Sequence, residues 1–480
     1  MNTVSRACLA GLHRHAFKAL VTGLATVAVT QSLRAQLTLG EALRRADTAA
    51  FANRTATAVT ALADAQRGAP LRGILPSVRV EAGYLRTTDP VGAFGTQLKQ
   101  REIAPSDFAP ASLNFPDPIG NYPAGLVAEL PLVNVDSWLA RRAASRAGAG
   151  SESAAGWTRV STRADVIRAY YGAVLVEERA AMFDAAAAAA QAHVRQAESM
   201  VRAGMATRSD ALLAAVRAGE VETQRIEAHS DATITRRQLA LLIGLGPNAT
   251  PTVPSRLPAP AVIRQVASSD TVERTPAARL DVDAARLQVE AARDGVQRAR
   301  ALYLPRVNSF ARYDWNSPQH VYGGEKSWTI GVVASWSPFD GGSQRSESRI
   351  AAARLALATT AADAAADQAR LETQRSRATL QAALVRLDIG ERSVAQSVEA
   401  HRIVTRKYEG GLATVAELLD AAAAETGSTL ALSSAQYAVI SAAAERRRVL
   451  GDDPGTLVTL EATTVATTRQ RPATTQEDSP

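Results

Sequence analysis

The chemically versatile side chains of this 480-residue sequence do not form any familiar catalytic motif. It contains no His-Glu-x-x-His, no Gly-x-Gly-x-x-Gly after a strand and no phosphate-binding glycine loop before Lys-Ser/Thr. The histidines beyond residue 35 are scattered, and no cysteine accompanies them: His193, His229, His320 and His401. We therefore expect no enzyme, no metal site and no cofactor, and we interpret His193 and His401 as helix-surface residues.

Two carboxylates near the end of the sequence are the strongest candidates for a charged site. Glu417 and Asp420 are three positions apart, so a helix beginning just after Gly411 carries both on one face. Carboxylates gathered in a narrow opening attract cations and raise one another's pKa. The simpler interpretation is a solvated acidic face near a helix start, where the helix dipole favours negative charge.

The elements that position these carboxylates belong to an internal duplication. Pro131 lies 73 residues before Gly204, and the same spacing separates Pro338 from Gly411. The second pair therefore follows the first at an offset of 207 residues. We divide the sequence into a signal peptide, a first repeat, a linker, a second repeat and a disordered tail, at residues 1–35, 36–245, 246–269, 270–451 and 452–480.

The N-terminal segment predicts export from the cytoplasm. An apolar run from Ala19 to Val29 follows Arg6, Arg14 and Lys18, and a small Ala35 comes after it. This pattern is typical of a cleaved signal and is too short to span a membrane. The net charge of +7 includes four positive residues and no acid from this segment, so the remainder carries only +3. Because arginine is spread along the whole chain, we exclude a nucleic-acid partner.

Segments in both repeats alternate between apolar and polar residues as strands do. The alternation is clear in Trp328–Trp336, Val307–Trp315 and Val78–Tyr84, whereas Leu126–Leu130 places its apolar residues in the other phase. Aromatic residues near the strand ends suit the interfacial girdle of a membrane barrel: Tyr84, Tyr313, Trp315, Trp328 and Trp336. Four strands cannot close a barrel alone, so several chains must contribute.

Long helices account for most of the remaining sequence. Thr38-x-x-Glu41 predicts a capping box at the start of the first helix. A helix over 137–202 would extend about 100 Å at about 1.5 Å per residue. Apolar residues recur at helical spacing in this helix, at Val166, Tyr170 and Val174. The matching helix of the second repeat has the same pattern at Leu380, Leu384 and Leu387. Gly204 and Gly411 predict the tips of two helical hairpins.

With these elements in order, the sequence resembles the TolC-like outer-membrane efflux proteins from Leu37 to Gly451. The shared features are Leu-Pro-x7-Tyr at 75–84 and 304–313, Ala-Tyr-Tyr at 169–171, Ser-Pro-Phe-Asp-Gly-Gly at 337–342 and the tip segments at 201–210 and 408–414. The first repeat departs from the Phe-Asp-Gly-Gly turn and has Leu-Val-Asn-Val-Asp at 132–136 instead.

The resemblance implies a mainly α fold with a small β part, built from a duplicated helix-strand-strand-helix-helix unit. Four strands per chain would complete a 12-stranded barrel in a homotrimer, above a helical tunnel that projects into the periplasm. The implied function is a passive duct for efflux or type I secretion in the outer membrane of a Gram-negative-type bacterium. The implied partners are a periplasmic adaptor, an inner-membrane pump of the RND, ABC or MFS type, and outer-membrane lipid.

The resemblance also assigns roles at the hairpin tips. The residues of the implied periplasmic aperture are Glu417, Asp420, Ser209, Asp210 and Tyr408. The residues implied to contact the adaptor are Arg202, Ala203, Gly204, Met205, Gly410, Gly411 and Leu412. The family's linking arginine is replaced by Ala413, so the closure of the aperture differs in detail.

Two other functions compete with the duct. A periplasmic coiled-coil adaptor would share the long hairpins but lack the alternating strands and the duplication, and usually carries a lipoyl-like β domain. A secreted enzyme on a helical scaffold would need a catalytic constellation that the sequence lacks. In the preferred interpretation, the long segment Thr87–Asn121 is a loop outside the cell that folds over the barrel mouth.

Overall fold

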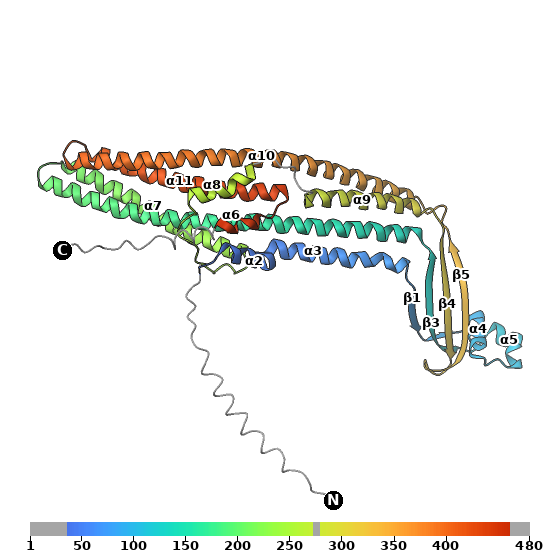
Figure 1. Ribbon diagram of the computed structural model, residues 1–480. Helices are drawn as coiled ribbons and strands as arrows, with labels where there is room; N and C mark the ends of the chain where they lie inside the picture. The colour runs from blue at the N-terminus through green and yellow to red at the C-terminus, as the bar shows by residue number, and fades with distance from the viewer. Residues whose placement is uncertain (1–35, 272–278, 461–480) are drawn as a thin grey trace, which may run out of the picture.

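The computed structural model describes residues 36–271 and 279–460 as a set of long helices joined to a sheet at one end (Figure 1). The first half contains α2 (Leu39–Ala49), α3 (Phe51–Gly68), η1 (Ala69–Gly73), β1 (Ser77–Ala82), β2 (Leu85–Thr87), α4 (Pro90–Gln100), η2 (Pro105–Phe108), α5 (Pro110–Asn114), β3 (Ile119–Val133), α6 (Val135–Arg202) and α7 (Arg208–Leu242). The second half contains α8 (Pro260–Ser268), η3 (Ser269–Thr271), α9 (Leu280–Ala301), β4 (Arg306–Ser317), β5 (Glu325–Ser335), α10 (Ser343–Glu409), α11 (Val415–Leu450) and η4 (Pro454–Val458).

The predicted hairpins are present in both halves. α6 has 68 residues and α10 has 67, so each extends about 100 Å at about 1.5 Å per residue. The turns after them pass through Gly204 and Gly411, with φ of 73° and 72°. Glycine adopts this left-handed conformation without the steric cost that a Cβ imposes. The tip positions predicted from these two glycines are therefore confirmed.

The strands form one antiparallel sheet in the order β1-β3-β4-β5, and β2 pairs with the same strand as β1. The register aligns one residue from each strand in the row Val80, Leu126, Tyr313 and Trp328. Because directly opposite residues share a face, the apolar residues of β3 lie on the same side as those of its neighbours. The prediction that the apolar residues of Leu126–Leu130 fall in the opposite phase to those of the matching strand in the second repeat is wrong. The face that a residue occupies depends on the residue it pairs with, not on the sequence offset between the repeats.

The opposite face of the sheet is mostly polar. Arg79 of β1 forms an ion pair with Glu129 of β3 at 3.2 Å, and Arg312 pairs with Asp314 along β4 at 2.7 Å. Large residues of the apolar face remain more than half exposed in one chain, among them Val78, Val80, Trp328, Ile330 and Val332. The sheet therefore separates one apolar surface from one polar surface, as a barrel wall between lipid and water does.

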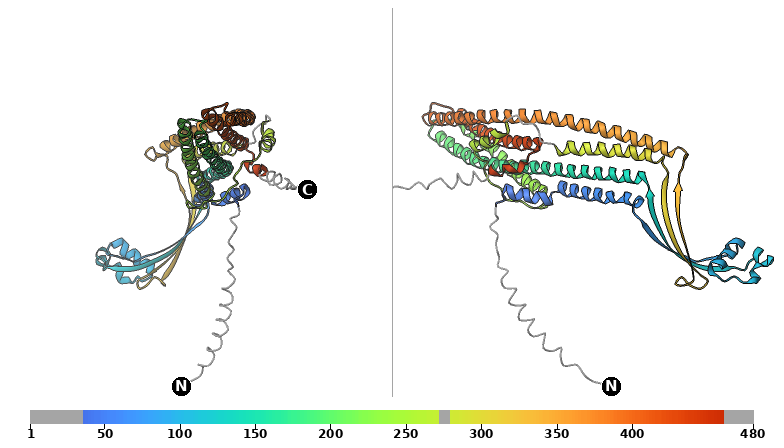
Figure 2. Two further views of the ribbon diagram at one scale, coloured as in Figure 1. Left: turned by 90° about the vertical axis from the view of Figure 1, so that its left-hand side faces the viewer. Right: turned by 45° about the vertical axis from the view of Figure 1, so that its right-hand side comes forward.

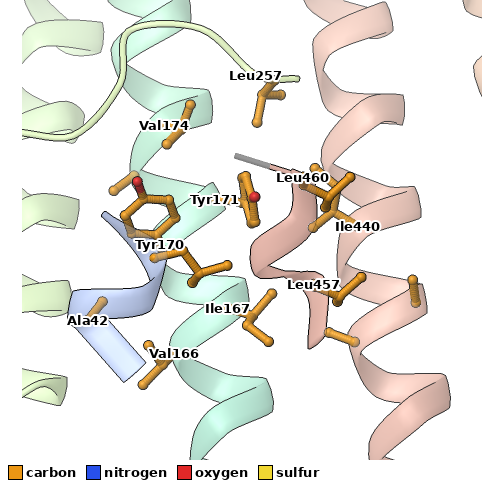
Figure 3. Packing of buried hydrophobic residues seen from close by; sticks show 14 of the residues in the cluster. Ala42, Val166, Ile167, Tyr170, Tyr171, Val174, Leu257, Ile440, Leu457 and Leu460 are labelled. Carbon is orange, nitrogen blue, oxygen red and sulfur yellow. The ribbon is translucent and has the colours of Figure 1, made fainter. Parts of the chain in front are cut away.

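The largest apolar core lies midway along the helices, and we call it the waist cluster. Here α2, α8 and η4 pack against α6, α10 and α11, so both repeats contribute. Tyr171 of α6 points toward Ile440 of α11 (Figure 3). The Tyr170 hydroxyl donates a hydrogen bond of 2.9 Å to the Leu37 carbonyl. The predicted apolar stripe is confirmed, because the cluster buries Val166, Tyr170, Val174, Leu380 and Leu387 and packs against Leu384.

The first helix differs from the prediction in two respects. Thr38 accepts a hydrogen bond of 3.2 Å from the Glu41 backbone N–H, as a capping residue does. The Glu41 carboxylate instead accepts hydrogen bonds from Arg44 and Arg45, so Thr38 alone caps this helix. At Ala50 the backbone leaves the helical conformation and divides the helix into α2 and α3.

Two segments predicted to be irregular contain structure. The tail predicted to be disordered from residue 452 belongs to the fold as far as residue 460, because Leu457 and Leu460 are buried in the waist cluster and Asp453 pairs with Arg163 at 2.6 Å. The long loop before β3 contains α4, η2 and α5, which lie beyond the far end of the strands (Figure 2). The predicted signal peptide and residues 461–480 lie outside the described part. Within that part, no helix is long and apolar enough to cross a membrane.

Candidate aperture at the hairpin tips

Both hairpin tips lie at the end of the molecule opposite the sheet, and both use the same local structure (Figure 1). After the first tip, Asp210 Oδ2 accepts a hydrogen bond of 2.9 Å from the Thr207 N–H, while Thr207 Oγ1 accepts one from the Asp210 N–H. After the second, Glu417 and Thr414 repeat this capping box, with 2.7 Å between Thr414 N and Glu417 Oε2. Two of the predicted aperture residues, Asp210 and Glu417, therefore stabilise helix starts.

Glu417 and Asp420 are both exposed near the start of α11. Hydrogen bonds from the backbone N–H and the hydroxyl of Thr414 lower the pKa of Glu417, so this carboxylate is ionised at neutral pH. Arg217 of α7 forms an ion pair with Glu220 at 2.8 Å. That pair and, to a smaller extent, the charge of Asp420 raise the pKa of Arg217. The acidic pair thus has a basic neighbour on the other hairpin, which sequence spacing could not reveal.

The two hairpins of one chain contact each other near their tips through a small apolar group, the tip cluster. Its buried members are Ala197, Ala214, Tyr408, Val415, Leu418 and Leu419. Tyr408 is 4% exposed, and its hydroxyl has no hydrogen-bond partner among the described residues. Burial and the nearby charge of Asp210 raise the pKa of Tyr408. The charge of Asp210 thus acts on Tyr408 within one chain, but no hydrogen bond joins the Tyr408 hydroxyl to it.

The residues predicted to contact an adaptor are all exposed at the turns: Arg202, Ala203, Gly204, Met205, Gly410, Gly411 and Leu412. Met205 is 69% exposed and Leu412 is 83% exposed, so each tip presents one large apolar side chain to its surroundings. Ser209 is also exposed, whereas Ala413 packs against the tip cluster.

The five predicted girdle residues lie at the other end of the molecule. The register places Tyr313, Trp315 and Trp328 on the apolar face of the sheet. Tyr313 and Trp315 pack edge to face with their ring centroids 4.9 Å apart. Trp336 follows β5 and donates a hydrogen bond of 3.1 Å to the Tyr303 carbonyl, and Tyr84 lies between β1 and β2.

His193 and His401, which the sequence predicted to be helix-surface residues, are each partly buried. Their ring centroids are 6.2 Å apart, and the Nε2 atom of each is buried without a hydrogen-bond partner among the described residues. Burial and, to a smaller extent, the charge of His401 lower the pKa of His193. His229 differs, because it is exposed and bonds to Asp184 at 2.9 Å. Within the described part of the chain, no three or more potential metal ligands form one group.

Comparison with known proteins identifies the chain. Its sequence matches the family described as Outer membrane efflux protein over residues 54–245 and 272–452. The chain belongs to this family. The predicted resemblance is thereby confirmed, together with the fold of a helical tunnel joined to a strand-based barrel part and the location in the outer membrane. This is a family of transport channels.

Solved structures of channels share the fold of this efflux protein. The outer membrane protein VceC from Vibrio cholerae is 20% identical, with a TM-score of 0.70 over 86% of this chain and 96% of that chain. The CmeC outer membrane channel from Campylobacter jejuni is 16% identical, with a TM-score of 0.72 over 90% of each chain. The open state of MtrE from Neisseria gonorrhoeae is 18% identical, with a TM-score of 0.67 over 86% of this chain and 89% of that chain. Comparison with the curated proteins found no match.

Proposed function

We propose that three copies of this efflux protein form a duct that leads from the periplasm across the outer membrane. The observation that carries the proposal is the two-faced sheet, whose outer edges at β1 and β5 have no strand partner in the described part of the chain. Three such sheets would close a 12-stranded barrel and pair every edge. The apolar face would meet outer-membrane lipid, and the ion-paired polar face would line water.

The hairpins would continue the barrel as a tunnel in the periplasm. The long helices α6 and α10 from each of the three copies would form much of its wall. At its end, three copies of Glu417 and Asp420 would surround the aperture and favour cations over anions. The exposed Met205 and Leu412 would contact a periplasmic adaptor and, through it, an inner-membrane pump of the RND, ABC or MFS type. CmeC and MtrE, which share this fold, are outer membrane channels, and this supports the proposed duct.

A periplasmic coiled-coil adaptor is the alternative function, because such proteins also contain long helical hairpins. The wide apolar face of the sheet disfavours it, since a protein dissolved in the periplasm gains nothing from exposing that face. Fractionation of cell membranes distinguishes the two. We expect the mature protein in the outer-membrane fraction, with the mass of three chains by light scattering in detergent. A mature protein that is freely soluble in the periplasm would contradict the duct.

The segment that carries α4 and α5 would lie outside the cell, at the barrel mouth. The Gln100 side-chain amide donates hydrogen bonds of 2.9 and 3.0 Å to the Gly120 carbonyl and the Asn121 side chain, which attaches this segment to the sheet. The only natural cysteine, Cys8, lies in the predicted signal peptide. A Ser112→Cys variant should therefore react with an impermeant thiol reagent on intact cells. Ser209→Cys, at the periplasmic tip, should react only after the outer membrane is permeabilised, and the opposite pattern would reverse this topology.

A further inference from the structure

A pair of histidines spans the two hairpins of one chain about three helical turns before the tips. His193 belongs to α6 and His401 to α10, and their ring centroids are 6.2 Å apart with the planes inclined by 68°. One hairpin is formed by α6 and α7 and the other by α10 and α11, so the backbone does not pass from one hairpin to the other near the tips. Contacts between the hairpins at this level therefore depend on side chains. A group that binds both imidazoles would therefore connect two elements that the backbone leaves separate at this level.

The hydrogen bond of His401 determines which ring nitrogen carries its proton. Its Nδ1 lies 2.5 Å from Oε2 of Glu425 on α11. An ionised carboxylate only accepts hydrogen bonds, so the proton is on Nδ1 and points to Glu425. In the neutral ring, Nε2 then presents a lone pair, and this atom is buried without a partner among the described residues.

His193 has a similar unsatisfied atom on the opposite helix. Its Nε2 is buried and has no hydrogen-bond partner among the described residues. Both rings thus leave one nitrogen unsatisfied in a place where burial of a free polar atom is costly.

We propose that His193 and His401 together bind one transition-metal ion of the zinc class through their Nε2 atoms. Imidazole nitrogen is a preferred ligand of zinc, nickel and copper, at about 2.0–2.1 Å for zinc. Histidines that ligate metals almost always have the other ring nitrogen held by a second group, which is the role of Glu425 here. The His401 side chain is 22% exposed, which gives the ion and its remaining water ligands a route to the site.

Calorimetric titration of Zn²⁺ into the metal-free trimer, produced without a histidine tag, tests the site. We expect one zinc-binding event per chain that disappears in His193→Gln and in His401→Gln. His229→Gln is the matched control, because His229 is exposed and bonded to Asp184, and it should bind zinc as the wild type does. Mg²⁺ should not compete, since it prefers oxygen ligands. Zinc binding that is absent from the wild type, or unchanged in the double variant His193→Gln/His401→Gln, would overturn the proposal.

Glu425→Gln provides a second test that leaves both imidazoles in place. If Glu425 orients His401 for a metal, this change should weaken zinc binding by about 10–100-fold. A glutamine of nearly the same size keeps the packing, so the test remains informative even where removal of a histidine prevents assembly. Unchanged zinc affinity in an assembled Glu425→Gln trimer would contradict the assigned geometry.

A shared ion would also hold the two hairpins together close to the aperture, a consequence that rests on the proposed function. Zinc should raise the melting temperature of the wild-type trimer, because it binds only the folded state, and should leave His401→Gln unaffected. In planar bilayers zinc should lower the current of the wild type but not of this variant. Histidine-dependent zinc binding without any effect on the current would reject the role at the aperture, whereas failed binding rejects the site itself.

Discussion

The waist cluster and the tip cluster both join the two hairpins, but they bury very different amounts of apolar surface. The waist contains Tyr170, Tyr171, Leu380 and Ile440, all at most 2% exposed. It also includes Leu37 and Leu460, which lie near the first and last described residues. The tip cluster buries far fewer residues and contains a buried hydroxyl, on Tyr408, that no described residue satisfies. Because most apolar burial is at the waist, the waist stabilises the fold and the tips can rearrange at lower cost.

The largest expected effect is loss of packing at the waist. Leu380→Ala removes a fully buried side chain and leaves a cavity, which should lower the free energy of unfolding by about 2–5 kcal/mol. Leu412→Ala, at an 83% exposed tip position, is the matched control and should change it by less than about 0.5 kcal/mol. Denaturant melts of the trimer in detergent compare the two. Equal losses would show that the waist is not the stabilising region.

A smaller effect is expected from the capping box of the second tip. Thr414→Ala removes the hydroxyl that accepts from the Glu417 N–H and should cost about 1 kcal/mol. Thr414→Ser keeps the hydroxyl and should retain most of that stability. Hydrogen exchange at the start of α11 measures the difference locally, and identical exchange in the two variants would contradict a capping role.

The smallest change in stability is expected at Tyr408, and with the opposite sign. Tyr408→Phe removes a buried hydroxyl without a partner, so the melting temperature of the trimer should rise or stay constant, a gain of at most about 1 kcal/mol. A clear decrease would indicate that the hydroxyl bonds to a neighbouring chain. The same substitution therefore distinguishes a tip held by packing from a tip held by a polar link.

These two regions also show what the sequence could predict. Helical spacing predicted the buried stripe at Val166, Tyr170 and Val174, because period and burial follow from one helix alone. The phase of Leu126–Leu130 was mispredicted, since it depends on which residue of β4 each one faces.

The same limit applies near the aperture. The electrostatic interaction of Arg217 with Asp420 and the ring contact of His193 with His401 join separate helices, so no local pattern could predict them. The capping boxes at Thr207 and Thr414 were local, and their identical offset from the tip glycines was available in the sequence.

The central claim is that the carboxylates at the hairpin tips line the aperture of a duct. Glu417→Gln/Asp420→Asn removes their charge, while glutamine at the third helical position still suits a capping box, so the trimer should assemble normally. Arg217→Gln is the complementary variant, because it removes the positive charge beside Asp420.

The most direct measurement is the reversal potential across planar bilayers under a salt gradient, at low ionic strength where screening is weak. The wild type should prefer cations, Glu417→Gln/Asp420→Asn should lose that preference, and Arg217→Gln should strengthen it. Unchanged cation selectivity in a correctly assembled Glu417→Gln/Asp420→Asn trimer would show that these residues do not line the aperture.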